Sequence, residues 1–99
     1  MASSLKNYKL YNIYYMAYNK MTTQEIKDVL SKGEVKFSYE KKDGTIREAF
    51  GTRNVAILEL HDAIPTGNKA ENDDVIPYFD LDVMAWRSFK AENFMGILD

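Results

Sequence analysis

The sequence predicts a mainly β fold with one short helix ahead of the strands, that is, a small α+β domain. Two segments, 34–50 and 76–90, alternate apolar and polar residues on either side of a turn, which is typical of β-hairpins. A third segment, 22–32, carries the start signal and the spacing of a short helix. The chain has 99 residues, of which 45% are hydrophobic and 28% charged, so we expect one domain with a modest core.

The helix is predicted over residues 23–32. Its start, Thr22-Thr23-Gln24-Glu25, is a capping box, in which the Thr22 hydroxyl accepts from the Glu25 amide and the Glu25 carboxylate accepts from the Thr22 amide. The apolar face that follows consists of Ile26, Val29 and Leu30. Gly33 marks the end of the helix.

The first hairpin is predicted to turn at Asp43-Gly44, a dipeptide typical of tight turns. Pairing across this turn sets Glu40 opposite Arg47, as a cross-strand ion pair, and Phe37 opposite Phe50. The apolar face of the hairpin then consists of Val35, Phe37, Tyr39, Ile46 and Phe50. A slip of one residue would bury polar side chains, so the alternation predicts this register.

The second hairpin is predicted to turn around Val83-Met84. This dipeptide is poor turn chemistry, so we expect an irregular loop. Pairing across the loop sets Asp80 opposite Arg87 and Tyr78 opposite Phe89.

The remaining segments of the domain are shorter. Residues 54–64 fit either a buried strand or a short helix capped by Asn54, and a run of this length does not decide between them. Residues 66–74 form a polar loop. We expect a single tight turn at 91–93 and a last strand over 94–98.

Residues 1–20 form a separate block, which contains five of the seven tyrosines and no acidic residue. Their spacing fits a helix in part and a strand in part, and neither pattern prevails. We expect residues 21–99 to form the domain. The first twenty residues are then a Tyr-rich arm that either packs on the domain or serves docking and self-association.

The composition excludes several classes of chemistry. The chain has no cysteine, which excludes disulfides, thiol catalysis and cysteine-based zinc sites. Its single histidine, His61, leaves no pair of histidines for a metal and no spare histidine for a catalytic triad. No nucleophile–base pair and no phosphate-binding glycine loop is recognisable. We therefore expect a protein that is not an enzyme and that holds no metal or other cofactor.

The net charge of −2 is unevenly distributed. Residues 1–54 hold ten basic and six acidic residues (+4), whereas residues 55–99 hold three and nine (−6). The basic half is suited to face a polyanion, but the overall pI of about 5.4 argues against a dedicated nucleic-acid coat protein. No apolar run approaches the length of a membrane span, so we expect a cytoplasmic protein without membrane contact.

Two long segments resemble a known family. KFSYEKKDGTIREAFGTRN (Lys36–Asn54) and YFDLDVMAWRSFKAENF (Tyr78–Phe94) are similar to small WYL-related proteins with an Sm-like SH3 β-barrel, which occur in gut bacteria and their phages. The resemblance covers residues 22–98 and implies a small β-barrel. Larger WYL relatives are regulatory domains associated with nucleic-acid or nucleotide ligands. By analogy, this implies an accessory or regulatory protein of a bacterium or of a phage-infected host.

Candidate binding residues come from both hairpins. Tyr78, Arg87 and Phe89 share one face, which we expect to be at least partly exposed if the alternate residues point to the core. Aromatic side chains beside an arginine are how β-barrel surfaces bind nucleotide bases. A basic track on the first hairpin extends this site, with Lys36 and Arg47 as its candidate binding residues and Lys41 and Lys42 beside them.

Two interpretations of this face and two functions stay open. In the competing interpretation, the helix or the arm covers Tyr78 and Phe89, and Arg87 only pairs with Asp80. The first function is the binding of nucleic acid or a nucleotide-type ligand. The second is a protein–protein or homo-oligomeric interaction module with no small ligand, in which the arm and an open sheet edge make the contacts.

Overall fold

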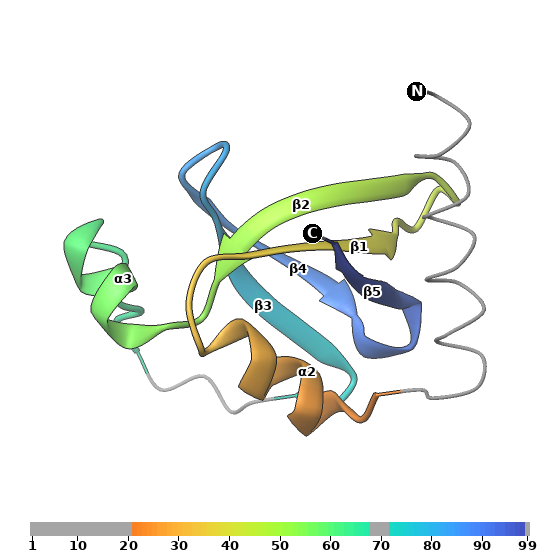
Figure 1. The fold of residues 1–99 in the computed structure, drawn as a ribbon, viewed down its shortest axis with the longest axis horizontal. Helices are drawn as coiled ribbons and strands as arrows, with labels where there is room; N and C mark the ends of the chain where they lie inside the picture. Colours follow the sequence, from red (N-terminus) through yellow and green to blue (C-terminus); the bar gives the residue numbers. More distant parts are fainter. Residues whose placement is uncertain (1–20, 68–71, 99) are drawn as a thin grey trace.

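The computed structural model of the chain describes residues 21–67 and 72–98, so the predicted arm over 1–20 lies outside the described residues. The described residues have the predicted mainly β fold with short helices (Figure 1). In chain order, the elements are α2 (Thr23–Leu30), β1 (Val35–Glu40), β2 (Ile46–Thr52), α3 (Val55–Leu60), β3 (Val75–Asp80), β4 (Ala85–Lys90), the 3-10 turn η1 (Ala91–Asn93) and β5 (Phe94–Leu98). None of the helices in this part of the chain has the length and apolar character needed to cross a membrane.

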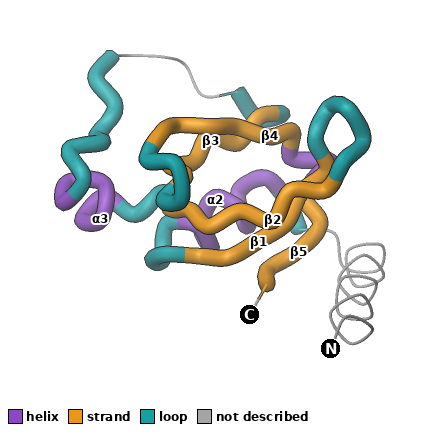
Figure 2. Tube along the Cα trace, turned by 90° about the horizontal axis from the view of Figure 1, so that it is seen from above, coloured by secondary structure: helices purple, strands orange, loops and turns teal. Residues whose placement is uncertain are grey.

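The strands form one antiparallel sheet in the order β4-β3-β2-β1-β5. The sheet curls, so that β3 and β4 lie across from β1, β2 and β5 (Figure 2). The two halves are joined at the end of β2, where Gly51 and Thr52 pair with Asp80 and Phe79 of β3. β4 and β5 are the two edges, and no hydrogen-bonded pairing between them closes the sheet.

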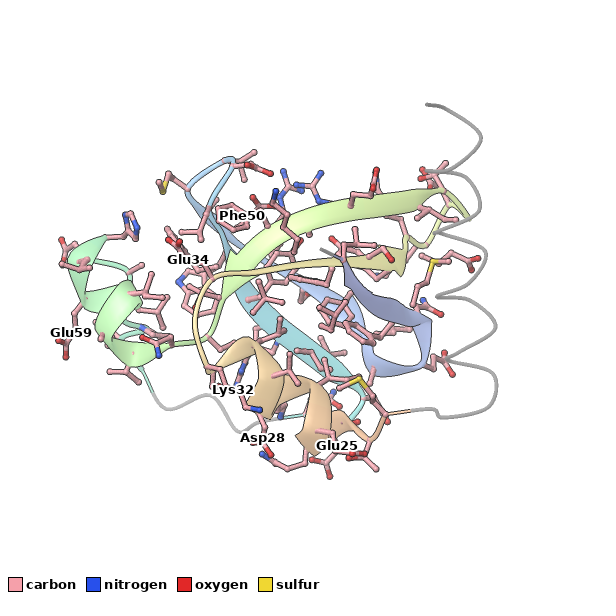
Figure 3. All side chains as sticks on the ribbon, in the orientation of Figure 1. Glu25, Asp28, Lys32, Glu34, Phe50 and Glu59 are labelled. Atoms are coloured by element: carbon pink, nitrogen blue, oxygen red, sulfur yellow. The ribbon has the colours of Figure 1, made fainter. Side chains whose placement is uncertain are left out.

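Both helices begin at capped positions. The Thr22 amide donates to Glu25 Oε1 at 2.9 Å and the Glu25 amide donates to Thr22 Oγ1 at 3.1 Å, so the predicted capping box is confirmed; Figure 3 labels Glu25 at this end of α2. The side chain of Asn54 accepts from the Ile57 amide at 3.0 Å and starts α3. The segment that was compatible with a strand or a helix is therefore helical, and Leu58 is its buried residue.

The register of the first hairpin differs from the prediction by one residue. The Gly44 amide donates to the Lys41 carbonyl at 2.9 Å, and the Lys41 amide donates to the Thr45 carbonyl at 2.7 Å. Gly44 has a φ of 87°, the left-handed conformation that glycine adopts without strain. The loop therefore has three residues, a turn followed by a glycine bulge, where the prediction assumed a two-residue turn at Asp43-Gly44. The additional residue sets Glu40 opposite Ile46.

This shift changes which residues of β2 face the core. Phe37 lies opposite Ala49, and Tyr39 lies opposite Arg47. Because the side-chain period of a strand is two, every residue of β2 is on the other face from the one predicted. Ile46 is consequently 46% exposed, and the predicted Glu40–Arg47 ion pair is wrong.

The second hairpin turns through the irregular loop that was expected, over residues 81–84. Its register differs from the prediction by two residues, with Tyr78 opposite Arg87 and Ile76 opposite Phe89. A shift of two preserves the faces, so Tyr78, Arg87 and Phe89 do share one face. The expected partial exposure of this face is confined to Arg87, whose side chain is 45% exposed, because Tyr78 and Phe89 are buried in the core.

The core consists of two clusters, one on each face of the curled sheet. Inside the curl, the cluster consists of Ile26, Leu30, Phe37, Tyr39, Ala49, Ile76, Tyr78, Phe89 and Phe94. Helix α2 contributes the first two of these residues, so it covers Tyr78 and Phe89 as the competing interpretation proposed. The second cluster consists of Leu58, Ala63, Phe79 and Leu81, and Phe50, which Figure 3 labels, packs against it.

Candidate functional site

The carboxylate of Asp80 is fully buried at the end of β3, where four groups surround it. Arg47 donates to Asp80 Oδ2 at 2.5 Å, and Nε of Arg87 lies 3.4 Å from the same oxygen. The backbone amides of Asp82 and Val83 donate to Oδ1 at 2.9 and 3.2 Å. Two cations therefore share one anion, and the group of three side chains carries a net charge of +1.

These contacts determine the ionisation of Asp80. Burial alone raises the pKa of a carboxyl group. At Asp80, the hydrogen bond from Arg47, the amides of Asp82 and Val83 and the charge of Arg47 together outweigh burial and hold the pKa below its usual value of 3.8. Asp80 is therefore ionised at neutral pH and serves as a fixed anchor for both arginines.

A pair of tyrosines connects this anchor to the core. The hydroxyl oxygens of Tyr39 and Tyr78 lie 2.8 Å apart, and Arg47 is close enough to the Tyr78 hydroxyl to act on its pKa, which it lowers. Burial and the hydrogen bond with Tyr39 raise the pKa of Tyr78 far above 10, so its phenol remains neutral at physiological pH. The network runs from Tyr39 to Arg87, whose side chain is 45% exposed at the surface.

A groove of about 580 Å³ opens beside Arg87, between the loop of the first hairpin and β4. We call it the basic groove, because four of its lining side chains are cationic and two are acidic. Its lining residues are Tyr39, Glu40, Lys41, Lys42, Asp43, Val75, Arg87, Ser88, Phe89, Lys90 and Asn93. The lining carries a net charge of +2 in a chain whose net charge is −2. It concentrates positive charge at one place on an acidic protein.

The structure does not bring the five predicted binding residues together. Tyr78 is in the core, and Arg47 is held by Asp80. Arg87 and Phe89 line the basic groove, although Phe89 does so from a buried position. Lys36 alternates with Phe37 along β1, so it lies on the outer face of the strand and does not line the groove.

Sequence reasoning missed Lys90 as a partner of this site. Lys90 ends β4, 48 positions after Lys42 (90 − 42), and both side chains line the groove. The predicted basic track includes Lys41 and Lys42 but follows the first hairpin alone. In the structure, these lysines face β4 across the basic groove. No local pattern signals this approach, since only the curl of the sheet brings the two hairpins together.

The described residues form one curled sheet of five antiparallel strands with short helices, which is consistent with a small β-barrel fold. Residues 23–95 match the family model described as WYL_2, Sm-like SH3 beta-barrel fold. The chain belongs to the WYL_2 family. The resemblance noted from the two hairpin segments is thereby confirmed, and so is the predicted fold class.

One relative of this WYL_2 protein is known from a phage. It is the "Uncharacterized 11.5 kDa protein in Gp31-cd intergenic region" of Enterobacteria phage T4, which is 31% identical over 87 residues. The match covers 79% of this chain and 85% of the phage protein. No solved structure matches the chain.

Proposed function

We propose that this WYL_2 protein is a non-enzymatic binding module that holds a phosphate-bearing ligand, a nucleic-acid strand or a nucleotide, in the basic groove. The observation that carries the proposal is the convergence of Lys41, Lys42, Arg87 and Lys90 from two hairpins on one groove. The proposal includes a role as an accessory or regulatory protein of a phage or a bacterium, and the uncharacterised phage relative supports the phage setting alone.

Arg87 is the residue whose side chain is best positioned to bind an anion. Its contact with Asp80 uses Nε, and Asp80 is also paired at shorter range with Arg47. The carboxylate orients the guanidinium while Arg47 neutralises the carboxylate, so a positive charge remains available at the surface. A planar guanidinium with oriented terminal nitrogens is suited to two phosphate oxygens.

The groove favours recognition of phosphates over recognition of bases. Tyr39 and Phe89, its aromatic lining residues in the described structure, are both buried, so neither presents a ring face to a base. Without stacking, affinity for a strand comes from lysine and arginine contacts to phosphates. We therefore expect weak sequence preference and a strong dependence on salt.

The test is fluorescence anisotropy of the full chain with short fluorescein-labelled oligothymidine and oligouridine, with ATP and cyclic AMP tested by calorimetry. Four phosphate contacts on a single strand predict a slope of about −3 in a plot of log affinity against log salt. Replacing Lys41 and Lys42 together by glutamine is expected to reduce that slope by about 1 to 2. Lys36→Gln removes one charge, against two in the groove variant, from the outer face of β1 and serves as the control.

The variant Arg87→Lys distinguishes recognition by the planar donors of a guanidinium from attraction by positive charge alone. Lysine keeps the positive charge but has no planar pair of donors, so we expect it to lose affinity at unchanged melting temperature. The proposal is wrong if none of the probes binds at low salt. It is also wrong if Lys36→Gln weakens binding as much as the groove variants do.

A further inference from the structure

An exposed apolar surface lies at the opposite end of β4 from Lys90. We call it the tip patch, and its residues are Leu60, Ile64, Val83, Met84 and Trp86. Helix α3 and the β3–β4 loop, which supply most of it, lie at the same end of the molecule (Figure 1). Leu60 is 82% exposed, Met84 54% and Trp86 38%. A hollow of about 680 Å³ between the two segments is lined by Ile64, Met84 and Trp86 among others.

The tip patch is held in place by contacts beneath it. Trp86 Nε1 donates to the Ala63 carbonyl at 3.1 Å, and the indole packs edge-on against Phe79 at 5.8 Å between ring centres. The His61 ring also stacks on Phe79, with 6.0 Å between the ring centres. The segment after α3 is thus fixed to β3 and β4, and the patch is preformed.

The β3–β4 loop holds one residue of the tip patch, Met84, in a strained backbone conformation. Met84 has a φ of 54°, in the left-handed region where glycine or asparagine is favoured. The loop, Leu81 to Met84, contains neither, and it exposes Val83 and Met84 at its tip. Strain retained at an exposed apolar residue indicates a role for that side chain in binding.

The charges around the tip patch restrict its partner. Glu59, Asp62 and Asp82 are exposed beside it, and none of the described residues that line the hollow is lysine or arginine. A complementary segment is therefore apolar and basic. Residues 1–20 of the chain have this composition, with three lysines, no acidic residue, five tyrosines and seven other apolar residues beside five serines and asparagines.

We propose that residues 1–20 of one copy dock on the tip patch of a second copy, and that the exchange is mutual. The arm joins the domain at Met21, which lines the same hollow as Lys90. Since β4 spans about 17 Å from Ala85 to Lys90, an arm binding its own patch must first run back along this strand. Twenty residues reach at most about 70 Å, so the arm is long enough for its own patch and for that of a neighbour. We choose the two-fold exchange because it is closed and occupies both patches.

The first test is the mass of the full chain in solution by light scattering and sedimentation. We expect a dimer whose dissociation constant rises at least tenfold in Met84→Gly. Glycine relieves the strained φ, so this variant should not lose melting temperature, which separates binding from folding. Ile46→Ser, at a similarly exposed apolar residue on β2, is the matched control and should leave the dimer unchanged.

A charge-swap experiment tests whether the arm of one copy contacts the tip patch of the other. One variant carries Lys6→Glu and Lys9→Glu in the arm, and the other carries Asp62→Asn and Asp82→Lys at the patch. Each alone should be largely monomeric, because arm and patch then repel or lose their attraction. Mixed together they should form a heterodimer, in which each arm meets a patch of complementary charge.

Three outcomes overturn the proposal. They are a full chain that is monomeric at high concentration, a dimer that Met84→Gly leaves unchanged, and a mixture that associates no better than its components. None of these outcomes bears on the proposed function of the basic groove, because nucleic-acid binding is tested with variants of other residues.

Discussion

The guanidinium of Arg47 donates to the buried carboxylate of Asp80, 33 residues further along the chain. The bond crosses from β2 to β3, where only two residue pairs connect the halves of the curled sheet. Arg87 of β4 reaches the same carboxylate, so one anion connects three strands. Asp80 therefore adds a side-chain connection to the two residue pairs at the junction of the sheet.

Asp80→Asn is expected to destabilise the protein by about 2–3 kcal/mol, because both arginines lose their anion while Arg47 stays partly buried. Urea unfolding followed by circular dichroism measures this loss. Arg87→Ala is the matched comparison, and it should cost less than about 1 kcal/mol because that side chain is nearly half exposed. Equal losses in the two variants would contradict the anchoring role of Asp80.

Stability should fall in acid through Asp80. Its pKa is lower in the folded chain than the usual 3.8, so the unfolded chain binds the proton first. The stabilisation is complete above the unfolded pKa and is lost as the pH falls through the folded one. Urea unfolding between neutral pH and about pH 3 should show this decline in the wild type and a shallower one in Asp80→Asn. Parallel curves would rule out Asp80 as the titrating group.

Gly51→Ala should weaken the β2–β3 junction. A Cβ at this position would lie 2.5 Å from Cδ2 of Tyr78 and 2.9 Å from the carbonyl oxygen of Phe79. The backbone carbonyl has no rotamer with which to move away, so we expect a loss of about 1–3 kcal/mol. Gly33→Ala has nothing within 4 Å of its Cβ and is the control. Thermal melts of both variants give the comparison, and equal melting temperatures would refute the close packing of Gly51.

Tyr78→Phe removes the hydroxyl that lies between Tyr39 and Arg47 while keeping the ring in the core. The Tyr39 hydroxyl is buried and loses its partner, so we expect a cost of about 1–2 kcal/mol in urea unfolding. Tyr78→Ala should cost about 3–5 kcal/mol, since it also leaves a cavity among the core rings. A Tyr78→Phe variant as stable as the wild type would show that the hydroxyl pair contributes nothing.

Much of this fold was predictable from local signals in the sequence. The capping box at Thr22 places α2, because it satisfies amides that any helix start leaves open. The two alternating segments place the four strands of the hairpins, and the hairpin motifs indicate the WYL_2 family. Each of these signals is contained within a few neighbouring residues.

The tertiary structure alone decided the register, the covered face and the site. The bulge at Gly44 moved β2 by one residue and turned Arg47 inward, and a dipeptide that fits two loop lengths does not reveal this. Alternation shows that Tyr78 and Phe89 share a face, but only the packing of α2 decides that this face is buried. Lys42 and Lys90 meet because the sheet curls, and curling depends on contacts between residues that are distant in the sequence. Local pattern determines the elements, and the burial of apolar surface against distant segments determines which side chains remain to bind.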